Sequence, residues 1–422
     1  MSKAQGASTA AGERPDDRKA KSAILIAAAG GHGLSHFIYQ GFLVALPTVK
    51  DALGIGPVGV GAIMTARELA SGFAALPGGV ICDRLQRYWG LILAACMAGF
   101  GLGWLVVSLS PSYLALIAGM VLLSVSSSLW HLPAMAALSQ RFSDRRGAAL
   151  SIHGVGGAVG DVVGPVLTGV LLGTLTWRGV ISAYAVGPLL LVPVVARVFR
   201  DTSWLRGSEQ ARSDLRTQVR ATRELLKDAL VWRINLVSCL RGMCYQAYTT
   251  FLPLFLAEEV GFDSRGVGFH LGLLFSVGIV ASPVMGHLSD RVGRKAVLVP
   301  TLIGLCVLSV LLALYGQGLA LTAIILLLGL FIRSDYSLLS AMVLDVVGEG
   351  VATTTLGIMS FARFVVGAVS PLIAGVLYER TGMRAVLYYA AGIYALAAVL
   401  LLTTRLRRAG VPDGVPAMDG GR

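Results

Sequence analysis

The stretch GVICDRLQRY, from Gly79 to Tyr88, returns as GHLSDRVGRK, from Gly286 to Lys295. Two other groups of residues repeat at almost the same spacing. Tyr39, Gln40 and Pro47 reappear as Tyr245, Gln246 and Pro253, and Pro165, Gly169 and Arg178 reappear as Pro371, Gly375 and Arg384. An offset of 206 or 207 residues at three separate places predicts a tandem duplication of one structural unit.

The composition indicates that lipid is the main solvent. Of 422 residues, 55% are apolar and 14% are charged, and the mean hydropathy is +0.74. Soluble domains carry roughly 25% charged residues. The net charge of +12 is gathered in alternate connections between apolar segments, which is typical of orientation in a membrane rather than of nucleic-acid binding.

Apolar segments long enough to span a bilayer recur along the chain, each near the roughly 20 residues that a spanning helix needs. The predicted spans are 23–49, 57–81, 89–108, 112–139, 148–172, 178–198, 231–257, 266–288, 296–316, 319–343, 352–378 and 384–404. We therefore expect an all-α membrane protein with 12 transmembrane helices in two six-helix, pseudo-symmetric bundles. Because an even number of spans separates the copies, both have one orientation, as in transporters built from parallel repeats.

The spans divide the chain into five parts. We expect an N-terminal tail (1–22), a first bundle (23–198), a linker (199–230), a second bundle (231–404) and a C-terminal tail (405–422). The first apolar segment is too long for a signal peptide, so we expect it to be retained. Within the linker, Leu215, Val219 and Leu226 form a thin apolar stripe, which fits either a solvated connection or a helix on anionic headgroups.

The distribution of basic residues predicts the orientation. The loops on one side of the membrane contain five basic residues: Lys50, Arg178, Arg265, Arg380 and Arg384. Four more lie within the predicted spans: Arg67, Arg241, Arg333 and Arg363. The remaining 26 of the 35 Lys and Arg residues lie on the other side, with both tails. Both termini are thus predicted to be cytoplasmic, in an integral plasma or inner membrane protein.

Catalytic and metal-binding patterns are not visible in the sequence. The five cysteines have no metal-ligand spacing, and we find no H-E-x-x-H, Ser-His-Asp or Cys/His grouping. We therefore expect no metal, no cofactor and no enzymatic activity. A membrane-embedded enzyme or receptor remains the alternative from a different class.

The duplicated stretch resembles a motif of a known transporter family. Its residues are Gly79, Asp83, Arg84 and Arg87 in the first copy, and Gly286, Asp290, Arg291 and Arg294 in the second. The pattern G-x-x-x-D-R-x-G-R-[RK] is similar to the cytoplasmic motif of the major facilitator superfamily, where it acts as a latch that favours the outward-open state. The second copy matches throughout, whereas the first has Gln86 and Tyr88 at two motif positions.

A second motif lies in the predicted fifth span, and it consists of Gly156, Gly160, Gly164, Pro165 and Gly169. Small residues at four-residue spacing favour close helix packing. The run resembles the antiporter motif of the same superfamily, G-x-x-x-G-P-x-x-G-G, with Thr168 in place of one glycine. The resemblance implies export, and the alternative is a packing seam with no bearing on direction.

Residues 30–170 resemble one branch of the superfamily more closely. The matching groups are Ser35-His36-Phe37 and Tyr39-Gln40-Gly41, the run LWHLP from Leu129 to Pro133, and the run GAALSIHGVGG from Gly147 to Gly157. They are similar to the fosmidomycin-resistance branch, whose members are proton-driven exporters of antibiotics and small organic anions.

Polar side chains inside the predicted spans are candidates for solute binding, because an ionisable group at the bilayer centre costs about 3 kcal/mol. The candidates are His32, His36, Tyr39, Gln40, Trp130, His131, Arg241, Tyr245, Tyr248, Arg333 and Tyr336. The superfamily resemblance places the helices that carry them, the first, fourth, seventh and tenth, around the cavity. The alternative is that they only bond one helix to another.

Asp161 is the first candidate for proton coupling, because it lies mid-span among glycines with no base nearby in sequence. His36 and His131 are the next candidates, since imidazole titrates near neutral pH. Glu68 beside Arg67 fits a structural pair or a coupling role, and Asp335 fits a neutralising partner for an arginine. The charges within the spans are slightly positive, which favours an anion or zwitterion as the solute.

These observations predict a secondary transporter that moves a small organic solute by alternating access, with proton-coupled efflux as the expected mode. An importer or facilitated exchanger of the same fold is the alternative. The expected partners are the solute, protons and the bilayer, with no nucleic acid, and we expect a monomer.

Overall fold

The structure, a computed structural model, describes residues 15–200, 227–347 and 352–405. Within these ranges the chain is helical and contains no β-strand. Eight of the described helices are long and apolar enough to cross a membrane. The expectation of an all-α membrane fold is therefore confirmed.

The first bundle consists of six α-helices. They are α1 (Pro15–Ala52), α2 (Pro57–Arg84), α3 (Trp89–Leu109), α4 (Tyr113–Arg141), α5 (Arg146–Leu171) and α6 (Trp177–Val198), with short 3₁₀ turns η1 (Gln86–Tyr88) and η2 (Ser143–Arg145). The side chains of Ser112 and Thr176 cap the N-termini of α4 and α6 by accepting backbone N–H bonds.

The second bundle repeats this order with one difference. Its helices are α8 (Ala229–Leu254), continued by the π-helical turn η4 (Phe255–Glu259), α9 (Ser264–Val292), α10 (Arg294–Tyr315), α11 (Gly318–Ile332), α12 (Ser334–Val347), α13 (Ala352–Thr381) and α14 (Met383–Thr403). The predicted tenth span is thus divided into α11 and α12 at Arg333. Irregular backbone at this depth is tolerated where it faces other protein groups or a polar cavity.

The two bundles are joined by a pair of equivalent contacts, as the duplication predicts. In one contact α5 packs on α9, and Gly268 lies against the carbonyl of Pro165; in the other, α13 packs on α2, and Gly61 lies against the carbonyl of Pro371. Gly61 and Gly268 are equivalent positions in the two repeats, and so are Pro165 and Pro371. The second contact is therefore the first one with the two bundles interchanged. This exchange is what a pseudo-two-fold axis between the bundles produces.

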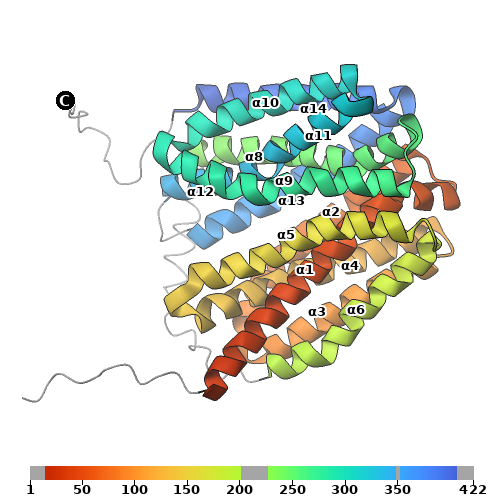
Figure 1. The fold of residues 1–422 in the computed structure, drawn as a ribbon. Coiled ribbons are helices and arrows are strands. Elements are labelled where there is room, and N and C mark those ends of the chain that lie inside the picture. The colour runs from red at the N-terminus through yellow and green to blue at the C-terminus, as the bar shows by residue number, and fades with distance from the viewer. Residues whose placement is uncertain (1–14, 201–226, 348–351, 406–422) are drawn as a thin grey trace, which may run out of the picture.

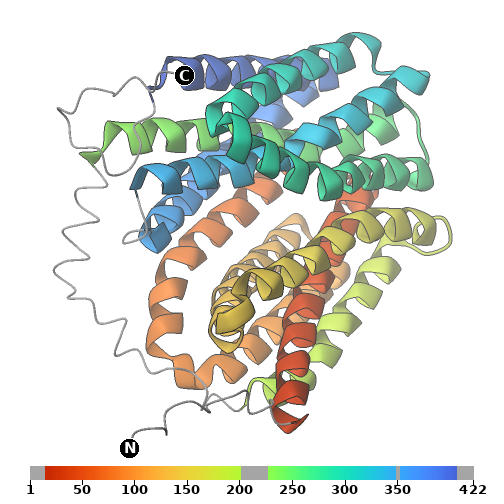
Figure 2. The same cartoon turned by 60° about the vertical axis from the view of Figure 1, so that its left-hand side comes forward.

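The two ends of the molecule differ. We call the end where α1 begins and α14 ends the terminal face, and the opposite end, with the turn glycines Gly54 and Gly261, the distal face. Contacts between the bundles run from mid-span, where the rings of Phe73 and Phe361 meet, to the distal face, where Ser264 donates to the carbonyl of Gly169. Figures 1 and 2 show the ribbons of the two bundles separating towards the terminal face.

Helices α1 and α5 pack unusually closely inside the first bundle. Gly156, Gly160 and Gly164 each face a backbone carbonyl of α1, and a Cβ atom at any of them would overlap that carbonyl. The polar residues of α1 are therefore held directly against those of α5. This contact brings the sequence-distant candidates of the two helices into one site.

Candidate solute site between the bundles

Asp161 lies at the centre of the site and joins the two bundles. Its side chain is 1% exposed, and Arg333 at the α11–α12 break forms an ion pair with it. The second carboxylate oxygen lies 2.7 Å from Nδ1 of His36 on α1. The sequence suggested an isolated carboxylate, but the fold gives Asp161 a cationic partner from the opposite bundle. A buried charge needs such a partner.

The break in the tenth span creates a polar anchor on the opposite side. The guanidinium of Arg241 on α8 donates to the carbonyl of Ile332, the last residue of α11. Arg241 also lies over the ring of Tyr245, 5.1 Å from its centroid. The aliphatic part of Arg333 packs on Gly278 of α9. Two arginines are thus fixed beside the interface by backbone and ring contacts.

Histidines gather on the other side of Asp161. His32 and His36 of α1 lie with His131 of α4 and His153 of α5, and neighbouring ring centroids are 4.2 to 4.8 Å apart. His32, His36 and His131 were candidates from the sequence. His153 was missed, because no spacing rule connects it to α1. The close packing of α5 on α1 brings it in.

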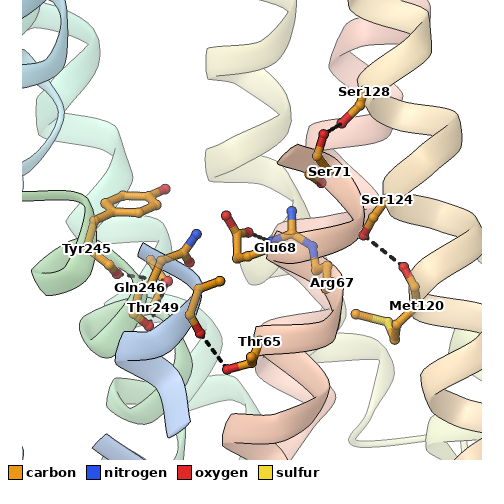
Figure 3. A network of polar contacts seen from close by, with 11 residues as sticks. Thr65, Arg67, Glu68, Ser71, Met120, Ser124, Ser128, Tyr245, Gln246 and Thr249 are labelled. Carbon is orange, nitrogen blue, oxygen red and sulfur yellow. Dashed lines mark hydrogen bonds and ion pairs between the residues drawn. The ribbon is translucent and has the colours of Figure 1, made fainter. Parts of the chain in front are cut away.

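A second polar group lies on α2, facing α8 across the interface (Figure 3). Arg67 is paired with Glu68, which is 3% exposed, and Arg67 also stacks on the ring of Tyr39 at 3.7 Å from its centroid. Figure 3 shows Tyr245 on the α8 side of this group. The side chain of Gln40 shares a hydrogen bond with Tyr245. The Arg67–Glu68 pair therefore forms part of the same interface.

Two of the predicted solute-binding residues point into helix packing. Trp130 is 1% exposed and lies against Gly31 in an apolar cluster with Ala28 and Ala134. The hydroxyl of Tyr248 is hydrogen-bonded at 2.6 Å to Ser309 of α10, inside the second bundle. Tyr336, another candidate, has a side chain outside the described residues.

The duplicated motif lies at the terminal ends of α2 and α9. In the second copy Arg294 pairs with Asp290 at 2.5 Å and with Asp345 of α12 at 3.1 Å, so it ties α9 and α10 to α12. Asp345 was missed, because its position relative to the motif is set by tertiary packing. Arg291 and Gly286 lie on the same turns of α9.

In the first copy of the motif, Arg84 is exposed and Arg87 lies over the ring of Tyr88. The side chains at Gly79 and Asp83 are outside the described residues. The structure therefore describes the first copy of the motif only in part.

The site combines two arginines of one bundle with a carboxylate and histidines of the other. Arg241 and Arg333 belong to the second bundle, whereas Asp161 and the histidines belong to the first. The Arg333–Asp161 pair therefore crosses from one bundle to the other. The guanidinium groups of the two arginines can donate charge-assisted hydrogen bonds to a small anion.

Comparison with known sequences gives the family. The sequence model of the Major Facilitator Superfamily matches residues 28–281 and 254–419. The chain is 22% identical over 385 residues to the fosmidomycin resistance protein of Escherichia coli. The alignment covers 89% of this chain and 92% of that protein. It is 24% identical over 362 residues to a probable sulfoacetate transporter of Cupriavidus necator.

Other relatives match over a shorter region. The chain is 32% identical over 184 residues to the multidrug resistance protein MdtG of Serratia proteamaculans, which is 40% of this chain. The match spans only 44% of the length of that relative.

Solved structures support the same architecture. A bacterial homologue of the human lysosomal transporter Spinster, in an inward-facing and unoccupied conformation, superposes with a TM-score of 0.76 at 15% identity, covering 94% of this chain and 100% of that one. The nucleoside transporter NupG gives a TM-score of 0.74 at 14% identity, covering 91% of this chain and 99% of that one. These likenesses show the fold.

Proposed function

Because the chain belongs to the Major Facilitator Superfamily of multi-pass membrane transporters, we propose that it exports a small organic anion or drug-like solute in exchange for protons. The observation that carries the proposal is the ion pair between Arg333 and Asp161, which joins the bundles beside the polar residues of α1 and α8. The names of the relatives, a fosmidomycin resistance protein and a probable sulfoacetate transporter, support an anionic solute.

The solute binds between the bundles in this proposal. Arg241 and Arg333 hold its anionic group, and Tyr39 and Tyr245 bound the site from the two sides of the interface. A guanidinium presents several donors in a fixed plane, which suits carboxylate, sulfonate and phosphonate groups. The anion thereby competes with Asp161 for Arg333. Binding therefore weakens a contact that holds the bundles together.

Asp161 couples the movement to protons in this proposal. Asp161 takes up a proton outside and releases it inside while the solute moves outward: protonation removes the charge that holds Arg333, and release of the proton restores the ion pair. His36, which contacts the other carboxylate oxygen, takes part in the transfer, and His131 lies behind it. The protein thus alternates between a state in which the Arg333–Asp161 pair is formed, as it is here, and a state in which the pair is broken.

The conformation supports alternating access. The bundles are in contact at the distal face and diverge towards the terminal face (Figure 2). With both termini in the cytoplasm of the cell, as the basic residues predict, this is an inward-facing state. We propose a monomer in the plasma or inner membrane, oriented in this way.

The test is solute export by purified protein in proteoliposomes with an imposed pH gradient. Fosmidomycin and sulfoacetate are the first probes. A thermal-shift measurement selects the one that binds, because a ligand that binds the folded form raises its melting temperature. We expect wild type to concentrate the bound probe against its gradient only when protons flow the opposite way. Asp161→Asn abolishes this uphill movement, whereas Asp144→Asn, an exposed carboxylate in η2, retains it. Uphill transport by Asp161→Asn with normal proton dependence contradicts the coupling proposal.

A further inference from the structure

Four of the six histidines in the chain form one cluster at the middle of the first bundle. His32 is central: its ring is stacked on His153 and meets His36 and His131 edge to face. The nitrogens of His32, His36 and His131 that are available as ligands all lie within 4.8 Å of one another. Transport of an organic anion does not require such a concentration of imidazoles.

The contacts made by His36 and His131 leave one nitrogen of each ring available as a metal ligand. Nδ1 of His36 lies 2.7 Å from a carboxylate oxygen of Asp161, and Nδ1 of His131 lies 2.7 Å from the backbone carbonyl of Ser127. An acceptor at Nδ1 holds the proton there and leaves the lone pair on Nε2. Carboxylates and backbone carbonyls orient metal-binding histidines in this same way.

His32 supplies an independent observation. Its Nδ1 atom is buried and has no hydrogen-bond partner among the described residues. Buried polar atoms are nearly always paired, so an orphan atom calls for a missing ligand or water. Ring stacking between histidines explains the contacts in the cluster but leaves this atom unsatisfied.

We propose that His32, His36 and His131 bind a divalent transition-metal ion, with Zn²⁺ as the best match. Zn²⁺ takes imidazole nitrogens at about 2.0–2.1 Å in tetrahedral geometry, which sets ligand nitrogens about 3.3 Å apart. The ligand nitrogens of the three rings lie within 4.8 Å of one another, so they must move closer together when the ion binds. Three protein ligands leave the fourth position open for water or another donor.

The surroundings suit a cation that enters from the space between the bundles. The His36 side chain is 32% exposed and that of Arg333 is 27% exposed, so the cluster is not sealed. Asp161 contacts His36 and is paired with Arg333, so the two charges next to the cluster balance and do not repel a cation. No metal-binding pattern is visible in the sequence, because the ligands come from α1 and α4 and their orientation depends on α5.

Cobalt is the probe for this site, because tetrahedral Co²⁺ has intense visible absorption that octahedral Co²⁺ lacks. The full chain is purified with a tag that contains no histidine, in detergent and with no solute or gradient, and is titrated with Co²⁺ and then with Zn²⁺. We expect one tetrahedral Co²⁺ per chain, displaced by one equivalent of Zn²⁺. His131→Gln and His32→Gln raise the dissociation constant for Zn²⁺ by more than about 100-fold, since loss of a supporting group alone costs 10–100-fold.

His287→Gln is the matched control, because His287 is an exposed histidine at the terminal end of α9. It leaves Co²⁺ absorption unchanged. Thermal unfolding without metal checks that each variant is folded. An octahedral spectrum, or binding that His131→Gln and His32→Gln leave unchanged in folded protein, overturns the metal site. The experiment involves no transport, so a failure here is separate from a failure of the export proposal.

Discussion

At the scale of single residues, two tyrosines that lie one helical turn apart on α8 have different surroundings. Tyr245 faces the interface between the bundles, beside Gln40 and Arg241. Tyr248 is 1% exposed and donates to Ser309 within the second bundle. Both were expected to line the solute pathway, because both lie near Arg241 on α8. The structure places Tyr245 at the interface between the bundles and Tyr248 in packing within the second bundle, and the solute-binding role of Tyr245 stays a prediction.

Removal of the two hydroxyls separates these roles. Tyr248→Phe leaves Ser309 bonded only to the carbonyl of Leu305, and we expect it to lower the free energy of unfolding by about 0.5–1.5 kcal/mol with little change in solute affinity. For Tyr245→Phe we expect the solute affinity to fall and the thermal stability to stay near that of wild type. Melting temperatures and probe affinities of both variants provide the measurement. A stable Tyr248→Phe variant with lost affinity contradicts the assignment.

At the scale of helices, α5 organises the site. One side of it packs on α1 through glycines, and its distal end packs on α9 of the other bundle. The same helix carries His153 and Asp161. The glycine motif therefore sets the distance between the histidines of α1 and the carboxylate of α5. Whatever its bearing on direction, the motif has a packing role that shapes the site.

The packing of α5 on α1 is tested by one added methyl group. A Cβ atom at Gly164 overlaps the carbonyl oxygen of Phe37, whereas one at Gly154 has open space around it. We expect Gly164→Ala to destabilise the protein by about 1–3 kcal/mol, as overpacking does. Gly154→Ala lies on the same helix and is expected to be neutral or slightly stabilising, since alanine favours helix. Thermal unfolding in detergent compares them, and equal melting temperatures contradict the packing argument.

At the scale of the whole molecule, the distal face is held closed by contacts between the bundles. Lys50 at the end of α1 pairs with Glu258 of η4 at 3.2 Å. Burial acts to lower the pKa of Lys50, but hydrogen bonds to Asp51 and Glu258 outweigh it, so the pKa lies above its ordinary value of 10.5. The stabilisation is therefore complete below pH 10.5 and is lost only as the pH rises through the higher value. Changes near neutral pH leave this lysine charged.

Loss of Lys50 shifts the balance between closed and open distal faces. An accessible ion pair contributes about 0.2–1 kcal/mol, so Lys50→Met increases the open population by up to about five-fold. Spin labels at the exposed distal positions Ala52 and Arg380 report the distance between the bundles. Lys295→Met is the control, because Lys295 donates to the carbonyls of Leu402 and Thr404 within the second bundle. An unchanged distance distribution in Lys50→Met contradicts a clamp at this pair.

The sequence by itself determined the helical membrane fold and the duplication, because hydrophobic length and repeat spacing can be read along the chain, but it did not show that the tenth span is divided at Arg333. It also identified Asp161, Arg333 and three of the clustered histidines as polar groups that lipid does not tolerate. Only the tertiary structure decided their partners. The ion pair from Asp161 to Arg333 crosses the bundles, the break at Arg333 leaves the Ile332 carbonyl to Arg241, and His153 joins the cluster through packing of α5 on α1. These contacts depend on the direction in which each helix face points, which spacing along one chain does not fix.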